Sequence, residues 1–199
     1  MATIDDKIIF WINGFVGKSA ALDRVMIWLA SDYFIPVTMA LMLLALWFCS
    51  GDAIQRDKYH RGIIVAAVSM GSVCGFVLAV SHLNWHWHPW QEHTDTLLPA
   101  TLKIFYPIHD PPFPSNTSSV TFAAAAAIWQ RSRKVGLLFL IPAVLMPLAK
   151  LYAAVYYPSD VVGGAILGIL TAYFIKLIMP VFEPIISRVL LTLRWLSLA

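Results

Sequence analysis

The sequence predicts an all-α fold: a polytopic transmembrane bundle of five to six helices, preceded by helices that lie at the membrane interface. Hydrophobic residues make up 59% of the 199 residues and charged residues 13%, which is about half the charged share of a soluble domain. The mean hydropathy is +0.73. The net charge is only +3, and its basic residues fall in short clusters between apolar runs, a pattern typical of membrane topology rather than of nucleic-acid binding.

Residues 1–32 are expected to form an amphipathic interfacial segment. Their apolar stretches are interrupted by Lys18, Asp23 and Arg24, so neither stretch reaches the ~20 residues that cross a bilayer. Helices of this kind lie in the headgroup region, where tryptophan is favoured. Residues 33–199 are expected to form the transmembrane domain.

The transmembrane domain divides into six apolar or amphipathic stretches. The third is short, and the sixth is amphipathic and lies at the surface or inserts partly. The expected ranges are about 33–50, 62–83, 118–131, 135–151, 161–182 and 184–198.

The basic residues predict an orientation. They gather at 56–61, 131–134 and 188–194, and the positive-inside rule places all three groups on the cytoplasmic side. The long connection 84–118 and the turn 152–160 then share the opposite, non-cytoplasmic face.

Lys150 and Asp160 are the charged residues of the hairpin 148–164 on that face. A lysine flanked by apolar sequence is costly in lipid and needs water, a partner or a function. Lys150 can snorkel to the interface, pair with Asp160, or supply the charge for an anion. Asp160 precedes the fifth stretch and is expected to cap its helix.

A second candidate stretch, 114–118, precedes the alanine-rich helix. Ser115, Asn116, Thr117 and Ser118 are expected around its N-terminus, where free backbone N–H groups attract phosphate. The alternative is an ordinary helix cap without a ligand.

Three histidines form the third candidate stretch. His82 and His86 are four residues apart, and His86 and His88 are two apart, so either pair has a spacing compatible with a metal or a tetrapyrrole magnesium. The alternative is a set of interfacial histidines among tryptophans. No metal or other cofactor is expected.

The order and spacing of these stretches resemble the type 2 phosphatidic acid phosphatase (PAP2) superfamily, in particular its small bacterial undecaprenyl-diphosphatases of the bacitracin-resistance type. That family carries Lys-x6-Arg-Pro, Pro-Ser-x-His and Ser-Arg-x5-His-x3-Asp stretches on the outer face of a six-helix bundle. The resemblance covers about 33–182. It implies a bacterial cytoplasmic membrane protein with a site for a lipid phosphate, such as a polyprenyl or glycerolipid phosphate, on the non-cytoplasmic side.

The resemblance also exposes departures from the family pattern. Pro89, Pro114, Ser115 and Asp160 match it. The remaining family positions are changed: the two arginines fall on His88 and Lys150, the lysine near Ser81, the histidine that protonates the leaving group on Thr117, and the nucleophilic histidine on Tyr156.

These substitutions do not decide whether the protein is an enzyme, but they favour the loss of the family's activity. The family reaction needs one imidazole as nucleophile and another as acid, whereas tyrosine, with a free pKa of ~10, is a poor nucleophile at neutral pH. The first hypothesis is a catalytically altered relative that binds a lipid phosphate through Lys150, the Ser115–Ser118 stretch and His88. The second is an active undecaprenyl-diphosphate or phosphatidate phosphatase. The third is a structural subunit of a larger membrane complex, with membrane-protein partners or a second copy of the chain.

Overall fold

The computed structural model describes residues 3–48, 52–81, 87–93, 97 and 112–195, and every regular element in these residues is a helix. This confirms the all-α prediction. The α-helices are α1 (Ile4–Asn13), α2 (Ala20–Ala30), α3 (Phe34–Phe48), α4 (Ala53–Ser81), α5 (Pro89–Glu92), α7 (Asn116–Trp129), α8 (Arg133–Tyr152), α9 (Pro158–Ile178) and α10 (Glu183–Trp195), and a 3-10 helix, η1 (Met179–Phe182), joins the last two.

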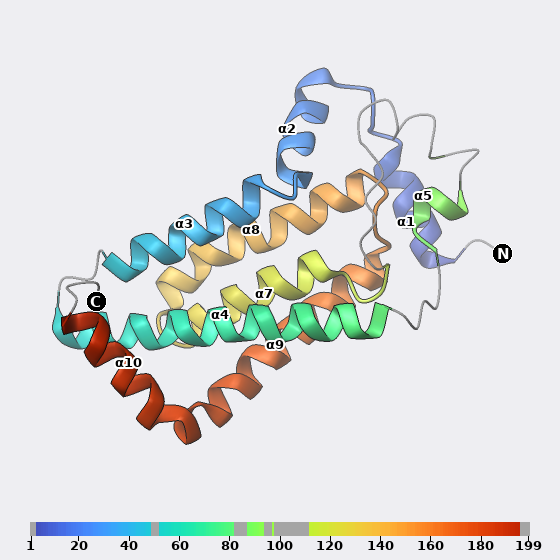
Figure 1. Ribbon diagram of the computed structural model, residues 1–199. Helices are drawn as coiled ribbons and strands as arrows, with labels where there is room; N and C mark the ends of the chain where they lie inside the picture. Colours follow the sequence, from blue (N-terminus) through green and yellow to red (C-terminus); the bar gives the residue numbers. More distant parts are fainter. Residues whose placement is uncertain (1–2, 49–51, 82–86, 94–96, 98–111, 196–199) are drawn as a thin grey trace.

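The alanine-rich helix α7 is the centre of the bundle. It lies between α4, α8 and α9 (Figure 1), and Ala123, Ala124 and Ala127 on it are buried. Small side chains let neighbouring helices approach closely. The approach is closest at Gly168 of α9, where an added Cβ would lie 2.2 Å from the carbonyl oxygen of Ser119.

Within the part of the chain that the structure describes, three helices are long and apolar enough to cross a membrane: 53–80, 133–152, and the continuous stretch 158–195. A fourth crossing is possible if α2 and α3, bent by 57° at their break, act as one span. The break at residues 31–33 coincides with the end of the segment expected at the interface. With 14 residues, α7 is shorter than the ~20 residues of a typical span.

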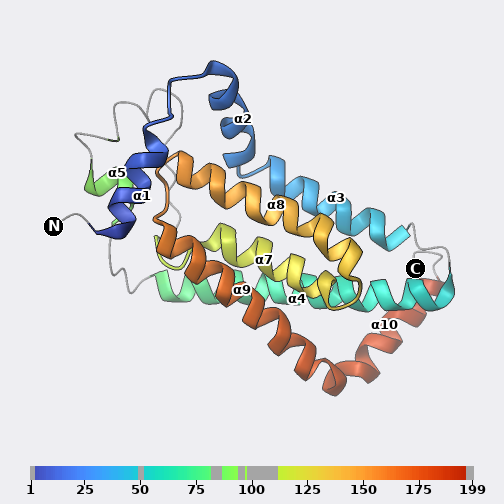
Figure 2. The same cartoon turned by 180° about the vertical axis from the view of Figure 1, so that it is seen from behind.

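The predicted basic clusters lie together at one end of the bundle, opposite the α8–α9 turn (Figures 1 and 2). Arg61 donates to Asp57 at 2.7 Å and also to Glu183 of α10, and Arg194 reaches Asp57 at 2.8 Å. These ion pairs hold α10 against the start of α4. They also explain why α4 begins at Ala53, nine residues before the predicted apolar run: its charged first turns are paired at the bundle end.

Candidate functional site

The turn between α8 and α9 is buried and lies at the centre of the candidate site. Residues 149–157 are all buried, and all of them except Lys150 form a hydrophobic cluster with Ile9, Val16 and Ala30 of the N-terminal segment. The chain reverses at Ala154, whose φ of 51° is in the left-handed region, an uncommon conformation for a residue with a Cβ. The turn is therefore fixed by its surroundings.

The three candidate stretches meet at this turn. The Nδ1 atom of His88 lies 2.6 Å from the carbonyl oxygen of Val155, and its ring centroid lies 5.8 Å from that of Tyr156. The backbone N–H of Ser115 donates to the carbonyl of Asp160 at 3.2 Å. Segments 45 and 67 positions apart in the chain thus share one end of the bundle, as the sequence predicted.

Lys150 is completely buried, and its ammonium lies 2.6 Å from Oδ1 of Asp32. The same nitrogen lies 6.0 Å from the ring centroid of Tyr156. The Asp32 side chain is 42% exposed, so this ion pair joins a buried cation to a carboxylate that reaches solvent or headgroups. Sequence reasoning considered Asp160 as the partner and missed Asp32, because no periodicity links positions 118 residues apart.

All four acidic residues of the segment 1–32 bond to this end of the bundle. The side-chain pairs are Asp5 with Ser159 at 2.5 Å, Asp6 with His93 at 3.0 Å, Asp23 with Tyr152 at 2.6 Å, and Asp32 with Lys150. The N-terminal helices α1 and α2 therefore cover the turn through polar contacts as well as apolar ones (Figure 1).

The start of α7 is built as the stretch 114–118 predicts. Ser115 is the N-cap, and its Oγ accepts from the backbone N–H of Ser118 at 3.3 Å. The Oγ of Ser118 and the Oδ1 of Asn116 are buried and have no hydrogen-bond partner in the described structure. Thr117 is buried as well. Unsatisfied buried polar atoms are costly, and an occupant that bonds to them stabilises the site.

Asp160 is the third residue of α9 rather than its cap. The N-cap is Tyr157, and the carboxylate of Asp160 reaches back to accept from the Tyr157 backbone N–H at 2.8 Å. The expected position is thus corrected by three residues, because Pro158 supplies the first helical residue with a preset φ. Burial, together with a hydrogen bond to Glu92 at 2.9 Å, raises the pKa of the Tyr157 phenol, which keeps it protonated.

Of the three histidines of the predicted site, the structure describes only His88. His82 and His86 lie outside the described residues, and His88 contacts a backbone carbonyl. Among the residues that the structure describes, no group of three His, Cys, Asp or Glu side chains is arranged to hold a metal ion. Ser81, near the position of the family lysine, is the last residue of α4.

Comparison with known proteins identifies relatives along most of the chain. The chain is 25% identical over 189 residues to undecaprenyl-diphosphatase BcrC of Bacillus subtilis (strain 168), covering 89% of this chain and 91% of that protein. It is 28% identical over 162 residues to the putative undecaprenyl-diphosphatase YbjG of Escherichia coli (strain K12), covering 80% and 74%.

The fold is shared with a solved structure. The crystal structure of Aquifex aeolicus LpxE superposes with a TM-score of 0.60 at 20% identity, covering 87% of this chain and 98% of that one. The sequence pattern of the PAP2 superfamily matches residues 87–183, about half of the chain, which run from Trp87 through the α8–α9 turn to the start of α10. By these matches this integral membrane protein is similar to the PAP2 superfamily in its sequence over residues 87–183, and to the diphosphatases over most of the chain.

Proposed function

We propose that this protein binds the phosphate of a membrane lipid at the α8–α9 turn, on the non-cytoplasmic side, without hydrolysing it by the phosphohistidine route. One observation carries the proposal. Lys150 and His88 both lie beside the buried Tyr156, yet hydroxyl side chains occupy both positions where that route needs imidazoles, Thr117 and Tyr156.

The chemistry of those two side chains argues against turnover. Attack on phosphorus needs a nucleophile that is unprotonated near neutral pH, and a free tyrosine has a pKa of ~10. A threonine hydroxyl is too weak an acid to protonate the leaving oxygen. Asp160, which would orient a histidine at position 156, instead bonds to the backbone N–H of Tyr157.

Groups that suit a phosphate remain. Lys150 supplies a buried cation, and the start of α7 supplies the unsatisfied Ser118 hydroxyl and the positive end of a helix. His88 adjoins Tyr156 at the same place. The Asp32 carboxylate already contacts the ammonium, so a bound phosphate displaces or shares this contact. In this proposal residues 1–32 act as an interfacial cover over a site in the domain 33–199.

The relatives indicate which lipid to test first. Because two of them are named as undecaprenyl-diphosphatases, undecaprenyl phosphate and diphosphate are the first probes. Purified protein in detergent is assayed for phosphate release from the diphosphate and, separately, for binding of both lipids by native mass spectrometry. We expect binding without release, and binding that weakens in Lys150→Met.

A restored-imidazole variant sharpens this experiment. Thr117→His with Tyr156→His returns both family histidines to a scaffold that otherwise keeps its site. Phosphate release by the double variant but not by the natural chain supports the proposal. Release by the natural chain establishes an active phosphatase, and absence of lipid binding by the natural chain overturns the proposal.

A structural role in a larger complex is the second candidate. The Lys150–Asp32 pair favours it, because the cation is matched within the chain itself. Gentle solubilisation followed by size determination separates the two functions: a stable assembly with other membrane proteins or further copies supports the structural role, and a lone protomer carrying lipid supports lipid binding.

A further inference from the structure

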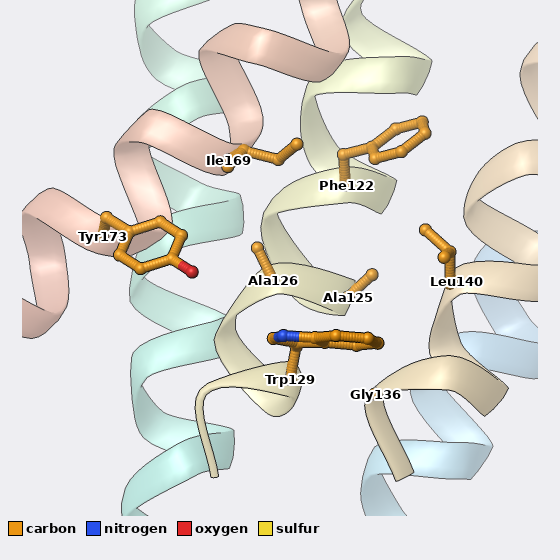
Figure 3. Close-up of a pocket in the computed structure, with 8 residues that line it drawn as sticks. All are labelled: Phe122, Ala125, Ala126, Trp129, Gly136, Leu140, Ile169 and Tyr173. Atoms are coloured by element: carbon orange, nitrogen blue, oxygen red, sulfur yellow. The ribbon is translucent and has the colours of Figure 1, made fainter. Parts of the chain in front are cut away.

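A hollow lies between α7, α8 and α9, in the half of the bundle that is remote from the α8–α9 turn. Its volume is about 240 Å³, larger than the ~150 Å³ of an engineered apolar cavity that binds benzene. Figure 3 shows its lining, which consists of Phe122, Ala125, Ala126, Trp129, Gly136, Leu140, Ile169 and Tyr173.

The sequence of α7 creates this hollow. Phe122 and Trp129, seven residues apart, form its two ends, and the small side chains of Ala125 and Ala126 lie between them (Figure 3). Gly136 closes one side, because any Cβ there would lie 2.5 Å from the Cα of Trp129. The hollow thus exists because two alanines lie between two large aromatic side chains on a helix that packs tightly against its neighbour.

The mouth of the hollow opens on the apolar outer surface. Tyr173 is 50% exposed and Trp129 36%, and the flanking Leu137, Leu170 and Phe174 are exposed as well. In a membrane protein such a surface faces lipid. Tyrosine and tryptophan are the residues favoured where hydrocarbon meets headgroups.

Two of the three helices that line the hollow, α8 and α9, carry a cation about one turn beyond it, on the side away from the α8–α9 turn. On α8, Arg133 precedes Gly136 by three residues. On α9, Lys176 follows Tyr173 by three, and residues three apart share a helix face. Both cations are exposed, and neither has an ion-pair partner among the described residues.

We propose that this hollow binds one acyl chain of an anionic phospholipid, with the lipid phosphate held by Arg133 and Lys176. The apolar lining suits the acyl chain of the lipid. The aromatic residues at the mouth suit a position near the headgroups, and the two cations match the negative charge of the headgroup. This site lies at the basic end of the bundle and is separate from the phosphate site proposed at Lys150.

The test uses the full chain in phosphatidylcholine nanodiscs that contain phosphatidylglycerol with a diazirine in one acyl chain. After irradiation, labelled residues are mapped by mass spectrometry. We expect labelling of the hollow to exceed that of Phe76, an exposed residue on α4. Ala126→Phe fills the hollow and is expected to lower its labelling about tenfold, because several methylene groups lose their burial.

Matched controls separate a specific site from surrounding lipid. Ala40→Phe adds the same ring at an exposed position of α3 and should leave labelling of the hollow unchanged. Ala126→Leu is a smaller change, used if Ala126→Phe impairs folding, and should give an intermediate loss of labelling. Arg133→Gln with Lys176→Gln should reduce labelling about fivefold, whereas Lys58→Gln should not. Labelling equal to that of Phe76, or unaffected by Ala126→Phe and Ala126→Leu, means surrounding lipid only and overturns the proposal. Labelling unaffected by the charge variant overturns its anionic part.

Discussion

The Nζ atom of Lys150 and the Oδ1 atom of Asp32 lie 2.6 Å apart, and they join the end of α8 to the break between α2 and α3. The lysine is fully buried, whereas the aspartate is partly exposed. The pair therefore fixes the N-terminal segment to the site and sets the local charge there. Changing either residue affects both the stability of this end of the bundle and its attraction for anions.

Asp32→Asn is expected to destabilise the protein by about 1–3 kcal/mol, because it removes a carboxylate that contacts the buried ammonium at 2.6 Å. Lys150→Met should recover part of this loss when it is combined with Asp32→Asn, since the double variant no longer buries the charge that Asp32 balances. Thermal unfolding of the four proteins in detergent gives the coupling energy, for which we expect roughly 1–2 kcal/mol. Lys58→Met, at an exposed position, is the control, and additive effects of the two changes would show that the pair is not coupled.

The same carboxylate should oppose a bound phosphate. Asp32→Asn is expected to tighten binding of undecaprenyl phosphate roughly 3- to 10-fold, because the ammonium is released from its internal partner. Native mass spectrometry over a lipid titration measures the change. Asp5→Asn removes an acid of the same segment that bonds to Ser159 instead and should have a smaller effect. Equal or weaker binding by Asp32→Asn would place the lipid phosphate elsewhere.

Gly168→Ala is expected to destabilise the protein by about 1–3 kcal/mol or more, because the new Cβ would lie 2.2 Å from the Ser119 carbonyl oxygen and force α9 away from α7. Gly75→Ala is the matched control: nothing lies within 4 Å of its added Cβ. Relief of glycine's backbone entropy should make that change neutral or stabilising by ~0.5–1 kcal/mol. Thermal unfolding compares the two, and equal effects would contradict the close α7–α9 packing.

The helices could be predicted well where apolar runs end at charges or caps. The expected range 135–151 became α8, and the cap predicted at 114–118 begins α7 one residue after Ser115. The start of α4 was placed too late, because Asp57 and Arg61 look unsuited to a bundle helix until α10 supplies their partners.

The site could be predicted in part. Motif spacing identified the segments that meet around Tyr156, since such spacing is visible along the chain. The contribution of Asp32 could not be predicted, because it depends on how α2 folds back over α8. The hollow beside Ala126 was missed for a related reason: a run of alanines indicates close packing, and only the arrangement of three helices shows where that packing leaves space.

The contact between Asp6 of α1 and His93, at 3.0 Å, should weaken in acid. Burial raises the pKa of Asp6, but hydrogen bonds from Thr3 and His93 outweigh it and hold this pKa below its usual 3.8. A carboxyl group whose pKa is lower in the folded than in the unfolded protein stabilises the fold at pH values above its unfolded-state pKa. This contribution is lost as the pH falls through ~4 and below.

Asp6→Asn should therefore lower stability at pH 6 by about 0.5–1 kcal/mol, the usual value of a helix-capping carboxylate. The difference from the natural chain should shrink as the pH approaches 3, where the natural carboxylate is also becoming protonated. Thermal unfolding of both proteins between pH 7 and 3 measures the contribution of the Asp6 carboxylate together with its contact to His93. A difference that stays constant across this range would show that the ionised carboxylate does not hold α1 against the site.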